Sequence, residues 1–238
     1  MIEFQNVSFA YEKGKPVLRD LSFRIEAGEA VGLIGANGAG KSTVMKLLLG
    51  LLSGEGKILV DGMDLGRTNL AEIRRKLGFV LQNSDNQMFM PTVYEDMMFA
   101  PLNYGLTREE AERRVDAALE RLGLTALKYR HNHKLSGGEK RMAAIATILA
   151  MEPEAILMDE PSSALDPYNR RIIINTIRAL RQTKLITSHD LDMILDTCDR
   201  VILLSEGRIA ADGPAEELLR DRDLLEANHM ELPLRFWR

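Results

Sequence analysis

A glycine-rich segment, GANGAGKS at residues 35–42, constrains the fold of this chain more than any other feature. It fits the pattern G-x-x-x-x-G-K-[ST], whose backbone N–H groups cradle the phosphates of a nucleoside triphosphate. The apolar run at 30–34 predicts a buried strand before it, and residues 41–49 predict a helix that ends at Gly50. A helix N-terminus adds its dipole to such a loop and stabilises an anion there. A strand–helix turn with a chance Lys-Ser is the alternative, but the flanking pattern favours nucleotide binding, with Lys41 on the β- and γ-phosphates and Ser42 on Mg²⁺.

Length, charge and cysteine content limit the classes of protein. With 238 residues, 45% of them hydrophobic and 28% charged, the chain suits one large α/β domain or two tightly joined lobes. A net charge of −4 argues against a general nucleic-acid surface, which needs an excess of Lys and Arg. The single cysteine, Cys198, excludes an internal disulfide framework and suits a reducing cytoplasm. No apolar run approaches the ~18 residues that span a bilayer, so in a membrane process another chain would do the spanning.

Hydrophobic periodicity predicts alternating strands and helices. The first thirty residues alternate as strands do, and further strands are expected at 57–62, 77–82, 155–159, 184–188 and 200–204. Helices are expected at 107–122, opened by a capping box from Thr107 to Glu110, and at 135–151. Because helices lie between the later strands, the sheet should be mostly parallel. The tail from 214 to 238 is expected to hold a helix and an irregular end.

Two carboxylates, Asp159 and Glu160, directly follow the buried strand at 155–159. In a protein with a phosphate loop, the first of such a pair holds Mg²⁺, directly or through water. The second can take or orient a proton of the water that attacks the γ-phosphate. A surface Asp-Glu-Pro turn is the alternative reading, and the phosphate loop upstream favours the functional one.

The segment LSGGE at 135–139 predicts a helix start with an additional purpose. Ser136 is placed as N-cap and Glu139 as its capping-box partner. Gly137 and Gly138 are not explained in this way, because adjacent glycines weaken a helix unless a backbone must come very close to something. The segment therefore predicts a second anion site. Two phosphate sites suited to the same nucleotide suggest that two chains share each ATP.

The set GANGAGKS, LSGGE, ILMDEP, SALD and TSH, in this order, resembles the ATP-binding cassette (ABC) ATPases over essentially the whole chain. The resemblance implies an α/β fold, with a P-loop NTPase (RecA-like) core, an N-terminal antiparallel β-subdomain and an inserted α-helical subdomain. It implies a single nucleotide-binding domain over 1–238, with the core at about 1–83 and 152–238 and the helical subdomain at about 84–151. Two cassettes would pack head to tail, with ATP between the phosphate loop of one and the LSGGE segment of the other.

The resemblance also assigns expected roles to single residues. Gln82 matches a glutamine that reaches Mg²⁺ and the attacking water, Glu160 the general base, and His189 the histidine that contacts the γ-phosphate. Asp166 matches an aspartate that crosses the dimer seam, and Tyr11 the aromatic that stacks on adenine. The expected Mg²⁺ ligands are Ser42, Gln82 and Asp159. The expected ATP-binding residues are Tyr11, Gly35, Ala36, Asn37, Gly38, Ala39, Gly40, Lys41, Ser42, Thr43, Ser136, Gly137, Gly138, Glu139 and Asp166.

The segment at 82–103 is similar to the ATPase subunits of energy-coupling factor and cobalt/nickel importers, and Glu139, where most cassettes carry Gln, is compatible with that group. The implied cargo is cobalt or nickel ions or a vitamin. The implied partners are a second cassette chain, identical or paralogous, and an integral membrane subunit. The implied location of this chain is peripheral, on the cytoplasmic face of the cell membrane. One departure is the C-terminus, which lacks the long extension of many ATPases in that group.

Two questions stay open at this point. Met88, Met90, Met97 and Met98 crowd one stretch, which suits either an adaptable docking groove for a partner helix or a Met-rich core. The function could also be that of a non-transport cassette, or of a regulatory ATP-binding module that does not turn over. The lack of coiled-coil insertions and of a second cassette argues against the first, and intact Glu160 and His189 argue against the second.

Overall fold

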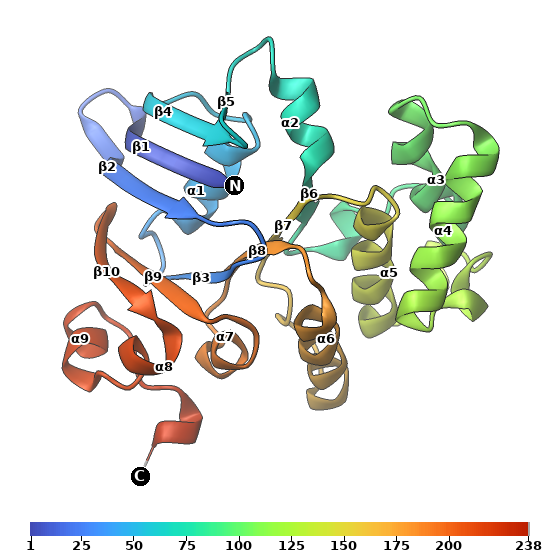
Figure 1. The fold of residues 1–238 in the computed structure, drawn as a ribbon. Coiled ribbons are helices and arrows are strands. Elements are labelled where there is room, and N and C mark those ends of the chain that lie inside the picture. The colour runs from blue at the N-terminus through green and yellow to red at the C-terminus, as the bar shows by residue number, and fades with distance from the viewer. Residues whose placement is uncertain (238) are drawn as a thin grey trace.

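Two β-sheets organise the chain in the computed structural model, which describes residues 1–237 (Figure 1). The first sheet is antiparallel, with strand order β2-β1-β4-β5. This arrangement confirms the predicted antiparallel β-subdomain near the N-terminus. Its strands are β1 (Ile2–Glu12), β2 (Lys15–Ile25), β4 (Glu55–Val60) and β5 (Met63–Asp64).

The second sheet has six strands in the order β10-β9-β3-β8-β7-β6. All of its pairs are parallel except β9 with β10, which is an antiparallel edge that the sequence did not predict. The expected mostly parallel sheet is thereby confirmed. Its strands are β3 (Ala30–Ile34), β6 (Leu77–Val80), β7 (Ala155–Asp159), β8 (Thr183–Thr187), β9 (Arg200–Ser205) and β10 (Arg208–Pro214).

Helices cover both faces of the six-stranded sheet. Helix α1 (Lys41–Leu48) contributes to the apolar core that the two sheets share, and α6 (Pro167–Ala179) and α7 (Leu191–Thr197) contribute to the core on the opposite face. Strand β7 shows why one strand serves both cores. Ala155 and Leu157 belong to the first core and Ile156 and Met158 to the second, because successive side chains point to opposite faces.

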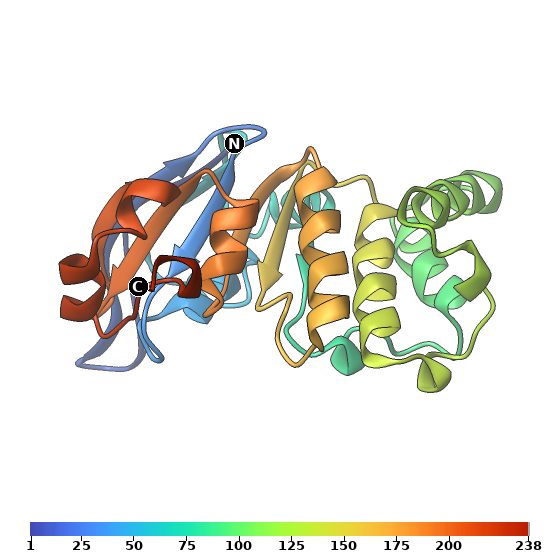
Figure 2. The ribbon, with the colours of Figure 1, turned by 90° about the horizontal axis from the view of Figure 1, so that it is seen from below.

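A helical lobe lies beside the sheets and consists of α3 (Val93–Asn103), α4 (Arg108–Leu122) and α5 (Gly137–Leu149) (Figures 1 and 2). Helix α5 contacts β6 and α6, so it joins the lobe to the sheet. The predicted capping box at Thr107 opens α4 as expected. Within residues 1–237, none of the helices combines the length and apolar character that crossing a bilayer demands. The shorter elements are α2 (Leu70–Lys76), α8 (Ala215–Leu218), α9 (Arg222–Ala227) and the 3₁₀ turns η1 (Ser84–Asn86), η2 (Thr125–Leu127), η3 (Asn132–Lys134) and η4 (Leu234–Phe236).

The predicted strand at 77–82 was wrong at its end. Strand β6 stops at Val80, because the N–H and C=O of Leu81 bond to the side chains of Gln87 and Arg141 instead of a neighbouring strand. The strand expected at 57–62 runs over Glu55–Val60, and the helix expected at 135–151 over Gly137–Leu149. The tail holds two short helices and a 3₁₀ turn, and residue 238, its predicted end, lies outside the described residues. We retain the boundaries 1–83, 84–151 and 152–238 as a proposal for the subdomains.

The Met-rich stretch divides between core and surface. Met88, Met97 and Met98 are buried in the core of the helical lobe, and Met90 is half-buried. Phe89, by contrast, is 61% exposed. The methionines are therefore mostly core residues, and the exposed apolar surface of this stretch is aromatic.

Candidate active site

The glycine-rich loop between β3 and α1 has a backbone that only glycine fits at two positions. Gly35 has φ +148°, and a Cβ there would lie 2.2 Å from the carbonyl oxygen of Leu204. Gly40 has φ +110°, and a Cβ there would lie 2.5 Å from the Leu18 side chain. Gly40 is also the N-cap of α1 and supplies no side-chain cap. The first N–H groups of α1 are therefore left for an external acceptor, which is the arrangement of an anion site.

Lys41 begins α1 and its ammonium turns back over the loop. Nζ donates to the carbonyl oxygens of Gly35 at 2.7 Å and Ala36 at 3.1 Å. The side chain is buried, and burial lowers the pKa of Lys41 against the opposing charges of Glu160 and Asp159. The ammonium is thus held between the loop and the two carboxylates by bonds that phosphate oxygens can replace.

Asp159 and Glu160 stand at the carboxyl end of β7. Asp159 accepts a hydrogen bond from Thr187 Oγ1 at 2.5 Å. Glu160 Oε2 accepts from Ser188 Oγ at 3.3 Å and from the His189 N–H at 3.2 Å. Glu160 Oε1 is buried without a hydrogen-bond partner and lies 3.6 Å from His189 Nε2. Burial raises the pKa of Glu160 despite the His189 N–H and imidazole, so the carboxylate is poised to accept a proton.

A cavity of about 370 Å³ unites most of the predicted site residues. The hydroxyl of Tyr11 lies 3.4 Å from Thr43 Oγ1 at one side of it, and the Tyr11 side chain is 57% exposed, as an aromatic that receives a base would be. The cavity is lined by Tyr11, Val17, Asn37, Gly38, Gly40, Lys41, Ser42, Thr43, Gln82, Asp159, Glu160 and His189. Gly35 and Ala36 line a second, larger cavity of about 960 Å³, and Asn37 and His189 line both cavities.

The oxygen ligands around the cavity fit Mg²⁺ only as part of a nucleotide complex. Ser42, Gln82 and Asp159 line the same hollow and offer a hydroxyl, an amide and a carboxylate oxygen. Among residues 1–237, no three His, Cys, Asp or Glu side chains gather as a metal site. Mg²⁺ in nucleotide-binding proteins relies on one or two carboxylates together with waters and substrate phosphates, so this donor set agrees with such an ion.

The LSGGE segment lies apart from this cavity. Ser136 Oγ accepts from the Glu139 N–H at 3.2 Å, and Glu139 Oε2 accepts from the Ser136 N–H at 2.8 Å, so the capping box forms as predicted. The Ser136 N–H holds the pKa of Glu139 below its ordinary value. None of the four residues from Ser136 to Glu139 lines the cavity around Lys41.

The two glycines of that segment have different surroundings. A Cβ on Gly138 would lie 2.2 Å from Asn169 Oδ1 of α6, so contact within the chain accounts for this glycine. A Cβ on Gly137 would meet nothing within 4 Å. The close approach expected at the two glycines is thus found within the chain at Gly138, and ATP binding by Gly138 stays a prediction. For Gly137, both the close approach of another group and ATP binding stay predictions.

Asp166 is the N-cap of α6 and accepts from the N–H groups of Tyr168 and Asn169, both at 2.9 Å. The Asn169 N–H and side chain hold the pKa of Asp166 below its ordinary value. Because Asn169 also packs on Gly138, Asp166 lies close to the LSGGE segment and not among the residues that line the Lys41 cavity.

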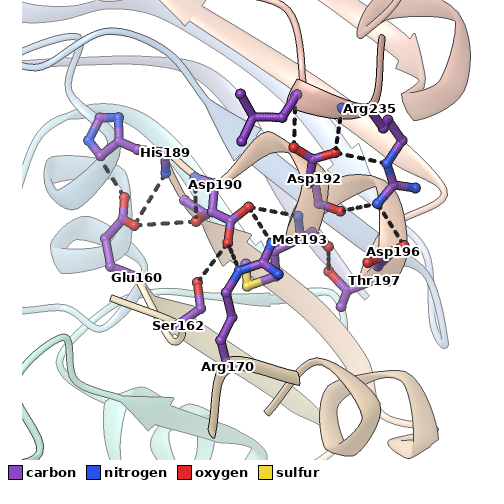
Figure 3. A network of polar contacts seen from close by, with 12 residues as sticks. Glu160, Ser162, Arg170, His189, Asp190, Asp192, Met193, Asp196, Thr197 and Arg235 are labelled. Carbon is purple, nitrogen blue, oxygen red and sulfur yellow. Dashed lines mark hydrogen bonds and ion pairs between the residues drawn. The ribbon is translucent and has the colours of Figure 1, made fainter. Parts of the chain in front are cut away.

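A polar network that the sequence reasoning missed supports His189 (Figure 3). The carboxylate of Asp190 accepts from Arg170 Nε at 2.5 Å and Nη2 at 2.7 Å, and from the Met193 N–H at 3.0 Å, where it caps α7. Although burial opposes it, the Arg170 guanidinium holds the pKa of Asp190 below its ordinary value. The N-cap pattern before α7 could have revealed Asp190, but Arg170 lies on another helix and left no local signal.

The same network reaches the C-terminal segment (Figure 3). Arg235 Nε donates to Asp192 Oδ1 at 2.8 Å and Nη2 to Asp196 Oδ1 at 2.9 Å, both on α7. The Leu234 N–H adds a bond to Asp192 Oδ2 at 2.8 Å. The last described residues are thereby attached to the helix that follows His189.

Comparisons with known proteins identify the family of this site. The family model described as ABC transporter matches residues 18–163. A protein named as an ABC transporter ATP-binding protein from Geobacter sulfurreducens is 46% identical over 98% of this chain and 94% of its own length. The energy-coupling factor transporter ATP-binding protein EcfA of Methanothermobacter thermautotrophicus is 42% identical over 98% of this chain and 77% of its own length.

Solved structures agree with these relatives. CbiO1 from Clostridium perfringens, described as part of the ABC transporter complex CbiONQ, aligns with a TM-score of 0.86 and 33% identity over 95% of this chain and 93% of that one. A dimeric ATP-binding cassette in a post-hydrolysis state, bound to ADP and Pi, aligns with a TM-score of 0.79 and 28% identity over 90% of this chain and 99% of that one. The predicted P-loop NTPase core is confirmed by these neighbours. The chain belongs to the ABC transporter ATP-binding proteins and is an ATPase of that family.

Proposed function

We propose that two cassette chains share each ATP across their interface, and that its hydrolysis drives an importer. The observation that carries the proposal is the separation of the two anion-binding helix ends. Lys41 and the start of α1 line one cavity, whereas Ser136 and Gly137 face open surroundings elsewhere on the chain. A site that needs both helix ends is incomplete in one chain, and a head-to-tail pair would complete two such sites. A neighbour solved as a dimer with ADP and Pi supports this arrangement.

The residues around the cavity have distinct parts in the proposed reaction. Lys41 binds the phosphates, Tyr11 packs on the base, and Ser42, Gln82 and Asp159 hold Mg²⁺, which neutralises charge on the phosphate oxygens when bound. Glu160 accepts the proton of the attacking water, which suits a carboxylate whose burial raises its pKa. His189 and the partner subunit's Ser136 and Gly137 contact the γ-phosphate, and Asp166 lies at the seam.

Complementation between two inactive variants tests the shared site. Lys41→Ala removes the phosphate-binding charge from a chain's own loop but keeps its Ser136. Ser136→Arg keeps the loop but fills the place of the partner's γ-phosphate. Each variant alone should hydrolyse little ATP, whereas a mixture should regain activity, because a mixed dimer holds one site with intact Lys41 and intact Ser136.

Ser136→Ala is the matched control, because it loses the same helix cap without adding bulk. It should retain more hydrolysis than Ser136→Arg at similar thermal stability. A wild-type rate in Ser136→Arg, or a mixture no more active than the separate variants, would show that Ser136 is only a helix cap.

The importer is proposed to be of the energy-coupling factor type, carrying cobalt or nickel ions or a vitamin. The names of two similar proteins, EcfA and a component of CbiONQ, support this class. The chain would then act as a peripheral subunit on the cytoplasmic face of the membrane, in a dimer of identical or paralogous cassettes. Co-purification of the untagged proteins encoded beside it would identify the membrane subunit, and ATP-dependent uptake of labelled metal or vitamin would identify the cargo.

The proposed docking surface for the membrane subunit is aromatic and lies on the helical lobe. Phe89 and Phe99 stack edge to face with ring centroids 4.9 Å apart, and they are 61% and 41% exposed. The carboxylate of Asp96 holds the main chain of this segment by accepting hydrogen bonds from the N–H groups of Phe89 and Met90, both at 3.1 Å. Exposed aromatic pairs of this kind are typical anchors for a partner helix, and the segment follows Gln82 directly.

A further inference from the structure

Arg141, on α5, is a buried cation with no carboxylate partner among residues 1–237. Its Nη1 donates to the carbonyl oxygen of Leu81 at 2.6 Å, its Nη2 donates to the carbonyl oxygen of Gln82, and its Nε has no partner. Burial lowers the pKa of Arg141. Burying an unpaired charge costs free energy. Neutral side chains of similar size would fill this place at lower cost, so the two carbonyl bonds are the evident reason for a cation here.

Gln87 completes the attachment of the same segment to α5. Its Oε1 accepts from the Leu81 N–H at 3.0 Å, and its Nε2 donates to the Ala144 carbonyl at 2.8 Å and to Thr147 Oγ1 at 3.1 Å. Together, Arg141 and Gln87 bind both main-chain groups of Leu81 and the carbonyl of Gln82. Strand β6 ends at Val80. The segment that follows it, which includes Gln82, is therefore attached to helix α5 rather than to the sheet.

The N-terminal end of helix α5 carries residues of the LSGGE segment. It begins at Gly137 behind the Ser136 cap, and Arg141 follows Gly137 by four residues, which is about one turn along the same helix. A rotation of α5 that includes its first turn would therefore also move the guanidinium that binds the Gln82 carbonyl. In the proposed dimer, Ser136 serves the partner's ATP and Gln82 serves the chain's own.

We infer that Arg141 is a positioning residue that holds Gln82 in place relative to the first turn of α5 and so couples the two ATP sites of a dimer. This inference rests on the proposed shared site and on the proposed part of Gln82. Arg141 touches neither nucleotide nor water in this role, and its whole effect on hydrolysis passes through Gln82.

A double-variant cycle on ATP hydrolysis tests this path, because a residue that acts only through Gln82 has no effect once Gln82 is removed. Arg141→Met should lower kcat about tenfold to a hundredfold, the loss that misplacing a reacting group typically causes. The Kd for ATP should stay within about twofold, since Lys41 and its loop are untouched. Gln82→Ala should also lower kcat, and the double variant should be no slower than the slower single variant.

Three further variants separate positioning from folding. Arg141→Lys keeps the charge but offers one donor group, so it should recover part of kcat. Gln87→Met removes one bond to Leu81 and two bonds to α5 without touching the buried charge, and it should show the same lack of additivity with Gln82→Ala. Ile145→Ala, one turn further along α5 and fully buried, should lower the melting temperature while leaving kcat near wild type.

The possible failures are distinct. If Arg141→Met and Gln82→Ala each slow hydrolysis and their effects multiply, Arg141 acts on stability or on another group, and the inference is wrong while the shared site stands. A wild-type kcat in Arg141→Met has the same meaning. A wild-type kcat in Gln82→Ala removes the proposed part of Gln82 and this inference with it, and leaves the complementation test of Ser136 unaffected.

Discussion

Glu160 combines three features that each oppose folding. Its φ of +49° places a non-glycine residue in the left-handed region, which costs about 1–2 kcal/mol. Its carboxylate is buried, and Oε1 lacks a hydrogen-bond partner, which costs about 1–3 kcal/mol. The N–H of Glu160, which donates to Thr187 O at 3.0 Å, and the bonds from Ser188 and His189 hold it in this state. The chain thus keeps its acceptor ready for a proton at the expense of stability.

Replacing this acceptor should separate binding from hydrolysis. Glu160→Gln keeps the size of the side chain but removes the base, so ATP and Mg²⁺ should still bind while kcat falls by about 10²–10⁴. ATP should then trap a dimer that size-exclusion chromatography detects. Glu154→Gln, an exposed carboxylate bonded to Lys76 away from the cavity, should hydrolyse ATP normally. A Glu160→Gln rate close to wild type would remove Glu160 from the role of base.

The raised pKa of Glu160 predicts a pH-dependent stability difference. Because the folded state binds the proton more tightly than the unfolded chain does, this group's contribution to stability is fully present below pH 4.5 and is lost as pH rises through the higher folded-state pKa. Glutamine does not ionise and loses nothing. The melting temperature of nucleotide-free Glu160→Gln should therefore exceed that of wild type by more at about pH 7.5 than at about pH 5. An equal difference at both pH values would contradict the pKa shift.

At the scale of elements, the start of α5 packs so closely on α6 that its two glycines should respond in opposite ways. Gly138→Ala forces Asn169 to move, since the new Cβ would lie 2.2 Å from Asn169 Oδ1, and should cost about 1–3 kcal/mol of unfolding free energy. Gly137→Ala meets open space and should leave stability unchanged or slightly higher. Thermal melts measure both changes.

Gly137, whose substitution should not lower stability, is the glycine expected to matter for dimer formation. In the proposed dimer the partner's γ-phosphate approaches Gly137, so Gly137→Ala should weaken ATP-dependent dimer formation in the Glu160→Gln background while the monomer stays stable. Normal dimer formation by Gly137→Ala would show that no group approaches closely at this position.

Local patterns predicted the elements that local chemistry determines. The strand, loop and helix at 30–49, and the capping boxes at Thr107 and Ser136, follow from neighbouring residues and were correct. The end of β6 was predicted wrongly and the contact that requires glycine at 138 was not foreseen, because both depend on side chains far along the sequence. The carbonyl of Gln82 accepts a hydrogen bond from Arg141 of α5 instead of pairing in the sheet, and Gly138 is covered by Asn169 of α6. The sequence places these partners in other helices and gives no local sign of the contact.

At the scale of the whole molecule, one apolar core continues from the six-stranded sheet into the helical lobe. The lobe is therefore packed against the sheet through a continuous core. This packing of distant elements determines which residues meet in the cavity, and it keeps Ser136 apart from them. Motif order alone could name these residues but could not give their distances.

The proposed docking surface of the lobe yields a prediction for the assembled complex. Phe89→Glu and Phe99→Glu each place a charge at the exposed aromatic pair. A partner helix that covered the pair would remove water from this charge, which costs several kcal/mol. Both variants should bind ATP normally and lose the membrane subunit in a pull-down from membranes. Tyr129→Glu changes another aromatic residue, which is 70% exposed, and this variant should bind the membrane subunit as the wild type does. Unchanged pull-down with both Phe variants would place the docking site elsewhere.

The attachment of Arg235 to Asp192 and Asp196 determines which helix would carry a domain joined after this segment. Any polypeptide joined after this segment, in nature or by fusion, would hang from α7, whose cap Asp190 adjoins His189 (Figure 3). Such an addition would need no contact with the nucleotide to affect turnover. It would be attached to α7, which begins directly after His189 and Asp190. A cassette built in this way offers a ready point of control to whatever is appended there.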